Sequence, residues 1–191
     1  NIDIREFGSG NSGTTNAMRT LGKKYGFMTF FGDALKAVFA VGVTYLLFRN
    51  SCNDSLIAIA LYTGLGTILG HNFPFYMNFK GGKGIAASSG VIFSLVFFDW
   101  KFLALGIITF FVALALTKYV SFSSLCLMTG FFLEMIIFGQ LNMVHNLNQS
   151  EKIESYILVG IMMVLSYIRH KDNIKRLVNG TERKIGQKKE A

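Results

Sequence analysis

The 191-residue sequence is poor in charge, in proline and in cysteine. Only 16% of its residues are charged, one is proline and two are cysteine. A soluble domain of this length needs a largely polar surface, so this scarcity of charge argues against a soluble protein. Cys52 and Cys126 have neither the spacing of a disulfide framework nor that of a metal site, so neither is predicted.

Apolar residues, by contrast, make up 51% of the chain and gather in six runs. Asp33, Lys36 and Glu134 are the only Asp, Glu, Lys or Arg residues in these runs. Several runs are shorter than the roughly 20 residues that cross a bilayer. Glycine, serine and threonine at their ends can extend them, since small residues suit helix packing in lipid. We therefore predict an all-α, polytopic helical membrane bundle that forms one domain over residues 1–191. Its six expected spans are centred on Phe27–Phe48, Leu56–Leu69, Ile85–Phe98, Phe102–Leu116, Leu125–Phe138 and Tyr156–Ile168.

The basic residues are distributed unevenly between the predicted spans. Fifteen of the 19 Lys and Arg residues lie in segments 1–26, 70–84, 117–121 and 169–191, and only three lie in the alternate gaps. This is a positive-inside pattern, which predicts that the four basic segments face the cytoplasm. The net charge of +8 is thereby explained by topology and substrate handling, so no nucleic-acid partner is predicted.

The first basic segment is rich in glycine, hydroxyl and amide residues. It reads Gly8-Ser-Gly-Asn-Ser-Gly-Thr-Thr-Asn-Ala-Met-Arg19. Glycine lets backbone N–H groups converge on an anion, and an arginine offers a fork of donors to phosphate oxygens. The spacing matches neither the nucleotide P-loop nor the dinucleotide fingerprint, so no nucleotide cofactor is predicted. A plain loop that caps a helix at Ser12 or Thr14 is the structural alternative. The candidate site residues here are Ser9, Gly10, Asn11, Thr15, Asn16 and Arg19.

The second segment runs from Gly70 to Gly84 and ends in Lys-Gly-Gly-Lys-Gly. It places two ammonium groups beside the start of a span, and a helix N-terminus attracts phosphate. His71 is a candidate base or phosphate donor, although a lone loop histidine is more often structural. No chelating neighbour accompanies any of the three histidines, so no metal is predicted. The candidate site residues here are His71, Lys80, Gly81, Gly82 and Lys83.

The last two segments add a serine and a basic helix. Ser121 follows the fourth span, and the tail after Arg169 is predicted to leave the last span as a helix. His170 and Asn173 would share a face of that helix, being three residues apart. A basic cluster attracted to anionic lipid is the simpler interpretation of this tail.

Taken in order, these motifs resemble the bacterial acyl-phosphate–glycerol-3-phosphate acyltransferases of the Y type. The matching pieces run from Ser9-Gly10-Asn11 through Gly70-His71 and Lys80–Gly84 to Tyr119-Val-Ser121 and Arg169–Glu182. The family has seven spans, with one helix before the first motif, and this sequence starts at the first motif. Ala87 stands where the family commonly has threonine.

The resemblance implies transfer of a fatty acyl group from acyl phosphate to glycerol 3-phosphate, without a cofactor. It implies a bacterial inner-membrane enzyme with a cytoplasmic active site and a functional link to an enzyme that makes acyl phosphate. Ser9, Arg19, Lys83, His170 and Asn173 would be catalytic. The other candidates above would bind substrate.

Two questions stay open at this point. The base is either a histidine or a substrate phosphate; the phosphate is favoured because neither histidine has an evident carboxylate, and His170 and Asn173 are then expected to bind phosphate. A transporter or channel for a phosphorylated anion is the competing function. Acyl-CoA-dependent enzymes with Asp five residues after His are excluded, since Tyr76, Ser150 and Lys175 stand five residues after His71, His145 and His170.

Overall fold

The computed structural model describes residues 2–52, 55–144 and 147–187, so His145 lies outside the described residues. Every regular element in this part of the chain is a helix. The α-helices are α1 (Thr14–Thr20), α2 (Lys23–Phe48), α3 (Leu56–Asn72), α4 (Ile85–Ser94), α5 (Trp100–Thr117), α6 (Val120–Gln140), α7 (Gln149–Arg169) and α8 (Lys171–Val178). Short 3-10 helices η1 (Ile4–Glu6), η2 (Phe75–Met77) and η3 (Leu95–Phe97) complete the set.

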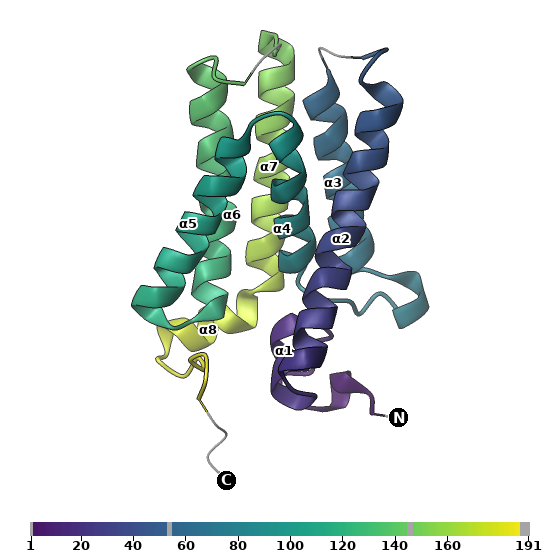
Figure 1. Cartoon of the computed structure of the whole chain (residues 1–191). Coiled ribbons are helices and arrows are strands. Elements are labelled where there is room, and N and C mark those ends of the chain that lie inside the picture. The colour runs from purple at the N-terminus through teal and green to yellow at the C-terminus, as the bar shows by residue number, and fades with distance from the viewer. Residues whose placement is uncertain (1, 53–54, 145–146, 188–191) are drawn as a thin grey trace.

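Helices α2 to α7 run up and down one bundle (Figure 1), which confirms the all-α membrane fold. Four segments are long and apolar enough to cross a membrane: Lys23–Phe48, Leu56–Met77, Trp100–Thr117 and Val120–Gln140. Helix α4 with η3 is shorter, and α7 carries Glu151, Lys152 and Glu154 in its first turns. The count of six spans therefore stays a prediction.

The helices extend beyond the apolar runs where polar residues cap them. The Asn148 side chain accepts from the backbone of Glu151, and the Glu151 side chain accepts from Asn148 in return. This capping box starts α7 seven residues before the apolar run. Asp99 similarly accepts a hydrogen bond from the Lys101 backbone and starts α5. Side-chain caps are not seen by a count of apolar residues, which explains the difference in boundaries.

Close helix contacts hold α4 in the middle of the bundle. Gly90 of α4 leaves no room for a side chain against the Ala34 backbone of α2. A Cβ added at Gly64 of α3 would lie 2.8 Å from Val91 of α4. Behind these contacts, Phe102 and Phe131 form a fully buried aromatic pair between α5 and α6. Small residues thus let three helices approach closely, as expected in lipid.

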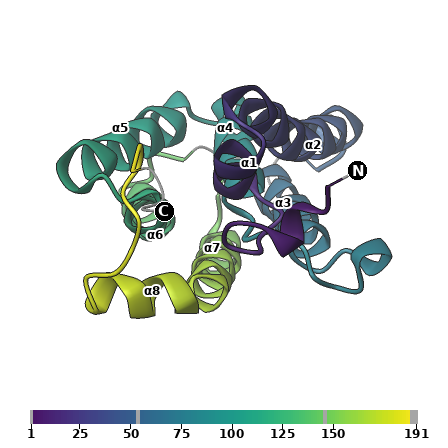
Figure 2. The ribbon, with the colours of Figure 1, turned by 90° about the horizontal axis from the view of Figure 1, so that it is seen from below.

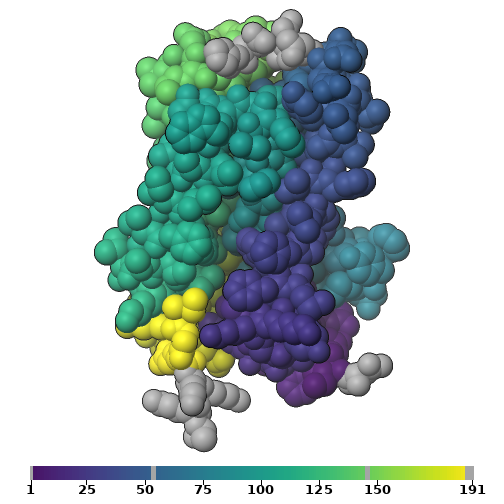
Figure 3. All heavy atoms as spheres, viewed as in Figure 1, coloured from purple at the N-terminus to yellow at the C-terminus, as the bar shows by residue number. Residues whose placement is uncertain are grey.

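The four basic segments gather at one end of the bundle. Helix α1, the loop around η2, the α5–α6 turn and α8 all lie at the lower end in Figure 1, and the loops after α2 and α6 lie at the other end. In the view from below, α1 is drawn over α4, and α7 and α8 lie toward the lower edge of the picture (Figure 2). In the space-filling view the yellow C-terminal segment borders the purple N-terminal part as seen from this side (Figure 3). The predicted grouping of these segments on one face is confirmed.

Candidate active site

The N-terminal segment is a loop that its own side chains hold in shape. Asn16 accepts from the Ser9 backbone at 2.8 Å and donates to the carbonyls of Ile4 and Phe7, both at 3.0 Å. Asn11 accepts from the Gly13 backbone at 2.9 Å. Helix α1 begins directly afterwards with Gly13 as its N-cap, so neither Ser12 nor Thr14 caps it. The buried Asn16 amide thus holds the loop together, and its expected role in orienting substrate stays a prediction.

The other candidates of this segment lie closer to solvent. Ser9 and Gly10 are exposed and Thr15 is half-buried in the first turn of α1. Arg19, one turn later, is exposed and lies within the electrostatic range of Arg176, Glu182 and Arg183. The tail and the first segment, far apart in sequence, thus meet around Arg19.

The Lys-Gly-Gly-Lys segment is clamped between two helices. The guanidinium of Arg169, at the end of α7, donates to the carbonyls of Gly81 and Gly82, both at 2.9 Å. The Gly81 N–H donates to the Asn72 carbonyl at the end of α3 at 3.2 Å. Neither glycine has room for a Cβ, because backbone atoms of α3 lie against Gly81 and the His71 ring lies against Gly82. We call Gly81 and Gly82 the glycine strap.

Lys83, directly after the strap, opens a chain of charged and amide groups. Its ammonium donates to the Asn173 side-chain oxygen. The Asn173 amide donates in turn to Glu182 at 3.0 Å, and Arg176 donates to the other Glu182 oxygen at 2.7 Å. Asn173 and Glu182 are both buried. The three segments 81–83, 173–176 and 182 therefore form one connected polar site.

Burial of the Lys83 ammonium, reinforced by the positive charge of Arg176, lowers its pKa to about 8. Glu182 and Asp172 oppose this shift because they favour the charged amine. Among the described residues, Glu182 is the one carboxylate that is hydrogen-bonded to Asn173 and Arg176 in this polar site. A site in which Arg19, Lys83 and Arg176 outnumber a single buried acid suits an anion.

His170 lies beside this chain at the junction of α7 and α8 and is almost completely buried. Its Nδ1 lies 2.8 Å from the Ser166 carbonyl oxygen. Because a carbonyl only accepts, the ring proton must be on Nδ1, which leaves Nε2 as an acceptor. Burial first, and the Lys83 charge second, lower the pKa of His170 to about 4. The ring is then neutral in the absence of a ligand, with Nε2 free to accept a hydrogen bond, and the expected phosphate contact of His170 stays a prediction.

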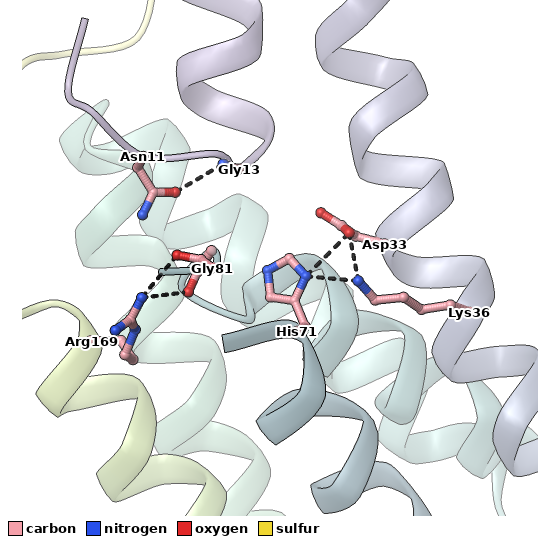
Figure 4. Close-up of polar contacts among 8 residues, drawn as sticks. Asn11, Gly13, Asp33, Lys36, His71, Gly81 and Arg169 are labelled. Carbon is pink, nitrogen blue, oxygen red and sulfur yellow. Dashed lines mark hydrogen bonds and ion pairs between the residues drawn. The ribbon is translucent and has the colours of Figure 1, made fainter. Parts of the chain in front are cut away.

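The neighbours of His71 also differ from those expected from the sequence. Its Nδ1 lies 3.2 Å from Asp33 Oδ1 and 2.7 Å from Lys36 Nζ, both on α2 (Figure 4). The statement that neither histidine has an orienting carboxylate is therefore wrong for His71. Asp33 is 38 residues away in sequence, and only the packing of α2 on α3 brings the pair together.

Two further candidates complete the placement. Ser121 is buried at the start of α6, and its hydroxyl has no hydrogen-bond partner among the described residues. Lys80, by contrast, is exposed at the end of the η2 loop, so the structure separates it from Lys83.

The sequence analysis missed four residues of this site: Asp33, Arg169, Arg176 and Glu182. Arg169, Arg176 and Glu182 belonged to the last motif of the family resemblance, but none of them was named as a candidate site residue. An acidic residue at position 182 in a basic tail was the available signal for Glu182. As a whole, the arrangement can bind and neutralise phosphate groups at the end of a lipid-embedded bundle.

Comparisons with known proteins agree on one family. Residues 1–180 match the sequence model described as "Glycerol-3-phosphate acyltransferase". Glycerol-3-phosphate acyltransferase 2 of Thermotoga maritima is 41% identical over 185 residues, covering 96% of this chain and 83% of the relative. The glycerol-3-phosphate acyltransferase of Bacillus subtilis is 38% identical over 186 residues, covering 96% and 84%.

Solved structures give the same result. The glycerol 3-phosphate form of PlsY, an integral membrane glycerol 3-phosphate acyltransferase, matches with a TM-score of 0.80 at 31% identity, covering 97% of this chain and 83% of that one. Its lysophosphatidic acid form matches with a TM-score of 0.76 at 30% identity, covering 93% and 81%.

Proposed function

Because the chain belongs to the glycerol-3-phosphate acyltransferase family, we propose that it acylates the C1 hydroxyl of glycerol 3-phosphate with acyl phosphate as donor. The products are lysophosphatidate and inorganic phosphate, and the reaction begins phospholipid synthesis. Acylation of glycerol 3-phosphate in a membrane is the activity named for its relatives. The acyl-phosphate donor, the attacking hydroxyl and the residue roles are our proposal.

The observation that carries this proposal is the connected polar site around Lys83. Both reactants bear phosphate groups, and the site offers cationic groups on Arg19, Lys83 and Arg176 against one buried acid. Holding two such reactants close and neutralising their charge supplies much of the rate acceleration. The site also lies at the end of apolar helices, where an acyl chain in the bilayer and a polar reactant from water can meet.

The chemistry needs little help from acid catalysis. The C1 hydroxyl oxygen attacks the acyl carbonyl and forms the ester bond. The anhydride bond between the carbonyl carbon and the phosphate oxygen breaks, and phosphate leaves with the electron pair. Cationic side chains stabilise the leaving phosphate, so Lys83 and Arg19 are the groups we expect to contribute most to kcat.

The hydroxyl proton goes to a substrate phosphate in this proposal. Phosphate esters have a second pKa near 6, whereas His170 has a pKa of about 4. The stronger base is therefore the phosphate. The free Nε2 of His170 is suited to accept a hydrogen bond from the glycerol backbone, and the unpaired Ser121 hydroxyl to bond a phosphate oxygen.

The basic end of the bundle faces the cytoplasm of a bacterial cell, with the chain in the inner membrane. The positive-inside pattern supports this orientation. An enzyme that makes acyl phosphate is then the functional partner. A transporter or channel for a phosphorylated anion is less well supported. It needs basic residues along a pore, whereas Lys36 is engaged with Asp33 and His71.

A donor comparison tests the proposal. The purified chain in lipid vesicles is given labelled glycerol 3-phosphate with either acyl phosphate or acyl-CoA, alongside a Lys83→Met variant. We expect labelled lysophosphatidate with acyl phosphate alone, and very little from the variant. Product from acyl-CoA but not from acyl phosphate would refute the donor assignment. Uptake of label into the vesicles without any acyl donor would instead favour the transporter.

A further inference from the structure

Helix α2 carries a charge pair within a membrane span. Lys36 Nζ donates to Asp33 Oδ1 at 2.7 Å, one helical turn away. Ionisable residues inside a bilayer are costly and are usually retained for a function. The stability of the fold does not require such a pair, because replacing two paired buried charges with apolar groups often leaves stability unchanged or raises it.

The pair does not close on itself but reaches His71 on α3. The His71 Nδ1 lies 2.7 Å from the Lys36 ammonium and 3.2 Å from the Asp33 carboxylate. The His71 side chain is only 10% exposed. The Nδ1 edge of the ring is thereby held by two charged groups from a neighbouring helix, as Figure 4 shows.

The opposite edge of the ring lies against the glycine strap. Nε2, Cε1 and Cδ2 of His71 fill the space that a side chain on Gly82 would need. Nδ1 is therefore engaged by the α2 pair, and the edge that carries Nε2 packs against Gly82. This placement makes His71 well suited to position the strap.

Arg169 holds the strap on its other side. It donates to both strap carbonyls from the end of α7. The strap is thus fixed between α7 and the α2–α3 pair, and the next residue is Lys83, whose ammonium reaches Asn173. A shift of the strap moves the Lys83 backbone, to which Gly82 is joined by one peptide bond, and with it the point from which the Lys83 side chain reaches Asn173.

We propose that Asp33 and Lys36 are positioning residues, which act through His71 and the glycine strap to place the Lys83 ammonium in the site. The inference deepens the proposed function and rests on it. Misplacement of a reacting group by about 1 Å can cost on the order of 100-fold in rate. The pair touches no substrate in this account, so its effect must pass through His71.

The test uses a neutral pair, Asp33→Asn/Lys36→Met, which leaves no unpaired charge in the membrane and so preserves folding. We expect kcat/KM for glycerol 3-phosphate to fall roughly 10- to 100-fold while Tm stays close to that of the unaltered protein. The matched control is Asp99→Asn/Lys101→Met, a comparable ion pair of 2.8 Å at the start of α5. It should leave kcat/KM unchanged.

Combining the neutral pair with a His71→Asn substitution tests whether the effect passes through His71. In a His71→Asn background, the neutral pair should lower kcat/KM no further, because residues that act as a unit are not additive. Full activity of the neutral pair, or an undiminished further loss in the His71→Asn background, would overturn the inference. Failure of the proposed function is distinguishable, because the unaltered protein would then form no lysophosphatidate in the same assay.

Discussion

The lowered pKa of Lys83 predicts that the activity of this protein declines at alkaline pH. Partial burial, with the charge of Arg176, places this pKa at about 8. The amine is then about nine-tenths charged at pH 7, half charged at pH 8 and roughly one-tenth charged at pH 9. Because the site needs the ammonium, kcat/KM should fall about fivefold between pH 8 and pH 9 and about tenfold for each further pH unit.

Substitution of Lys83 by arginine separates this cause from others. A guanidinium stays charged throughout the range, so Lys83→Arg should have a lower plateau but no decline between pH 8 and 9.5. The ionisation of glycerol 3-phosphate near pH 6 affects only the acid side of the profile. Initial rates of lysophosphatidate formation, corrected for spontaneous hydrolysis of acyl phosphate, measure the profile.

Lys80→Arg is the matched control, since Lys80 is exposed and lies only three residues earlier. It should keep the alkaline decline of the unaltered protein. A decline that survives in Lys83→Arg with the same midpoint would refute the assignment of Lys83. A decline that disappears in Lys80→Arg would show that Lys80, and not Lys83, is the lysine that titrates.

Two further predictions concern the strap and the buried serine. Gly82→Ala should lower kcat/KM at least about tenfold, because its Cβ would overlap the His71 ring, whereas Gly66→Ala, with open space around it, should have no effect on kinetics. Ser121→Ala should lower kcat with little change in Tm, because its buried hydroxyl has no partner among the described residues; Ser155→Ala, which removes an equally unpaired hydroxyl from α7, should leave kcat unchanged. Equal kinetic effects within either matched pair would contradict the site.

Much of the fold followed from the sequence because its signals are local. Apolar runs predicted the membrane bundle, and the unequal distribution of lysine and arginine predicted which segments share an end. The predicted helix after Arg169 is present as α8. The boundaries of α5 and α7 were missed because side-chain caps, not hydrophobicity, set them.

The site was harder to predict because its contacts join distant segments. The sequence shows Asp33 and Lys36 only as ionisable residues within an apolar run, and their meeting with His71 became visible in the fold. Glu182 lies in a tail whose composition suggests only a basic surface, and its burial depends on the packing of α8. The resemblance of the ordered motifs named the family, whereas the links between the motifs became visible only in the fold.

The central claim is that this site moves an acyl group from one phosphate-bearing molecule to another. Its most direct test measures both products of one reaction, with acyl phosphate and labelled glycerol 3-phosphate in vesicles that contain the purified chain. We predict equimolar lysophosphatidate and inorganic phosphate, with phosphate release dependent on glycerol 3-phosphate. Phosphate released at the same rate without glycerol 3-phosphate, and no lysophosphatidate, would contradict the account.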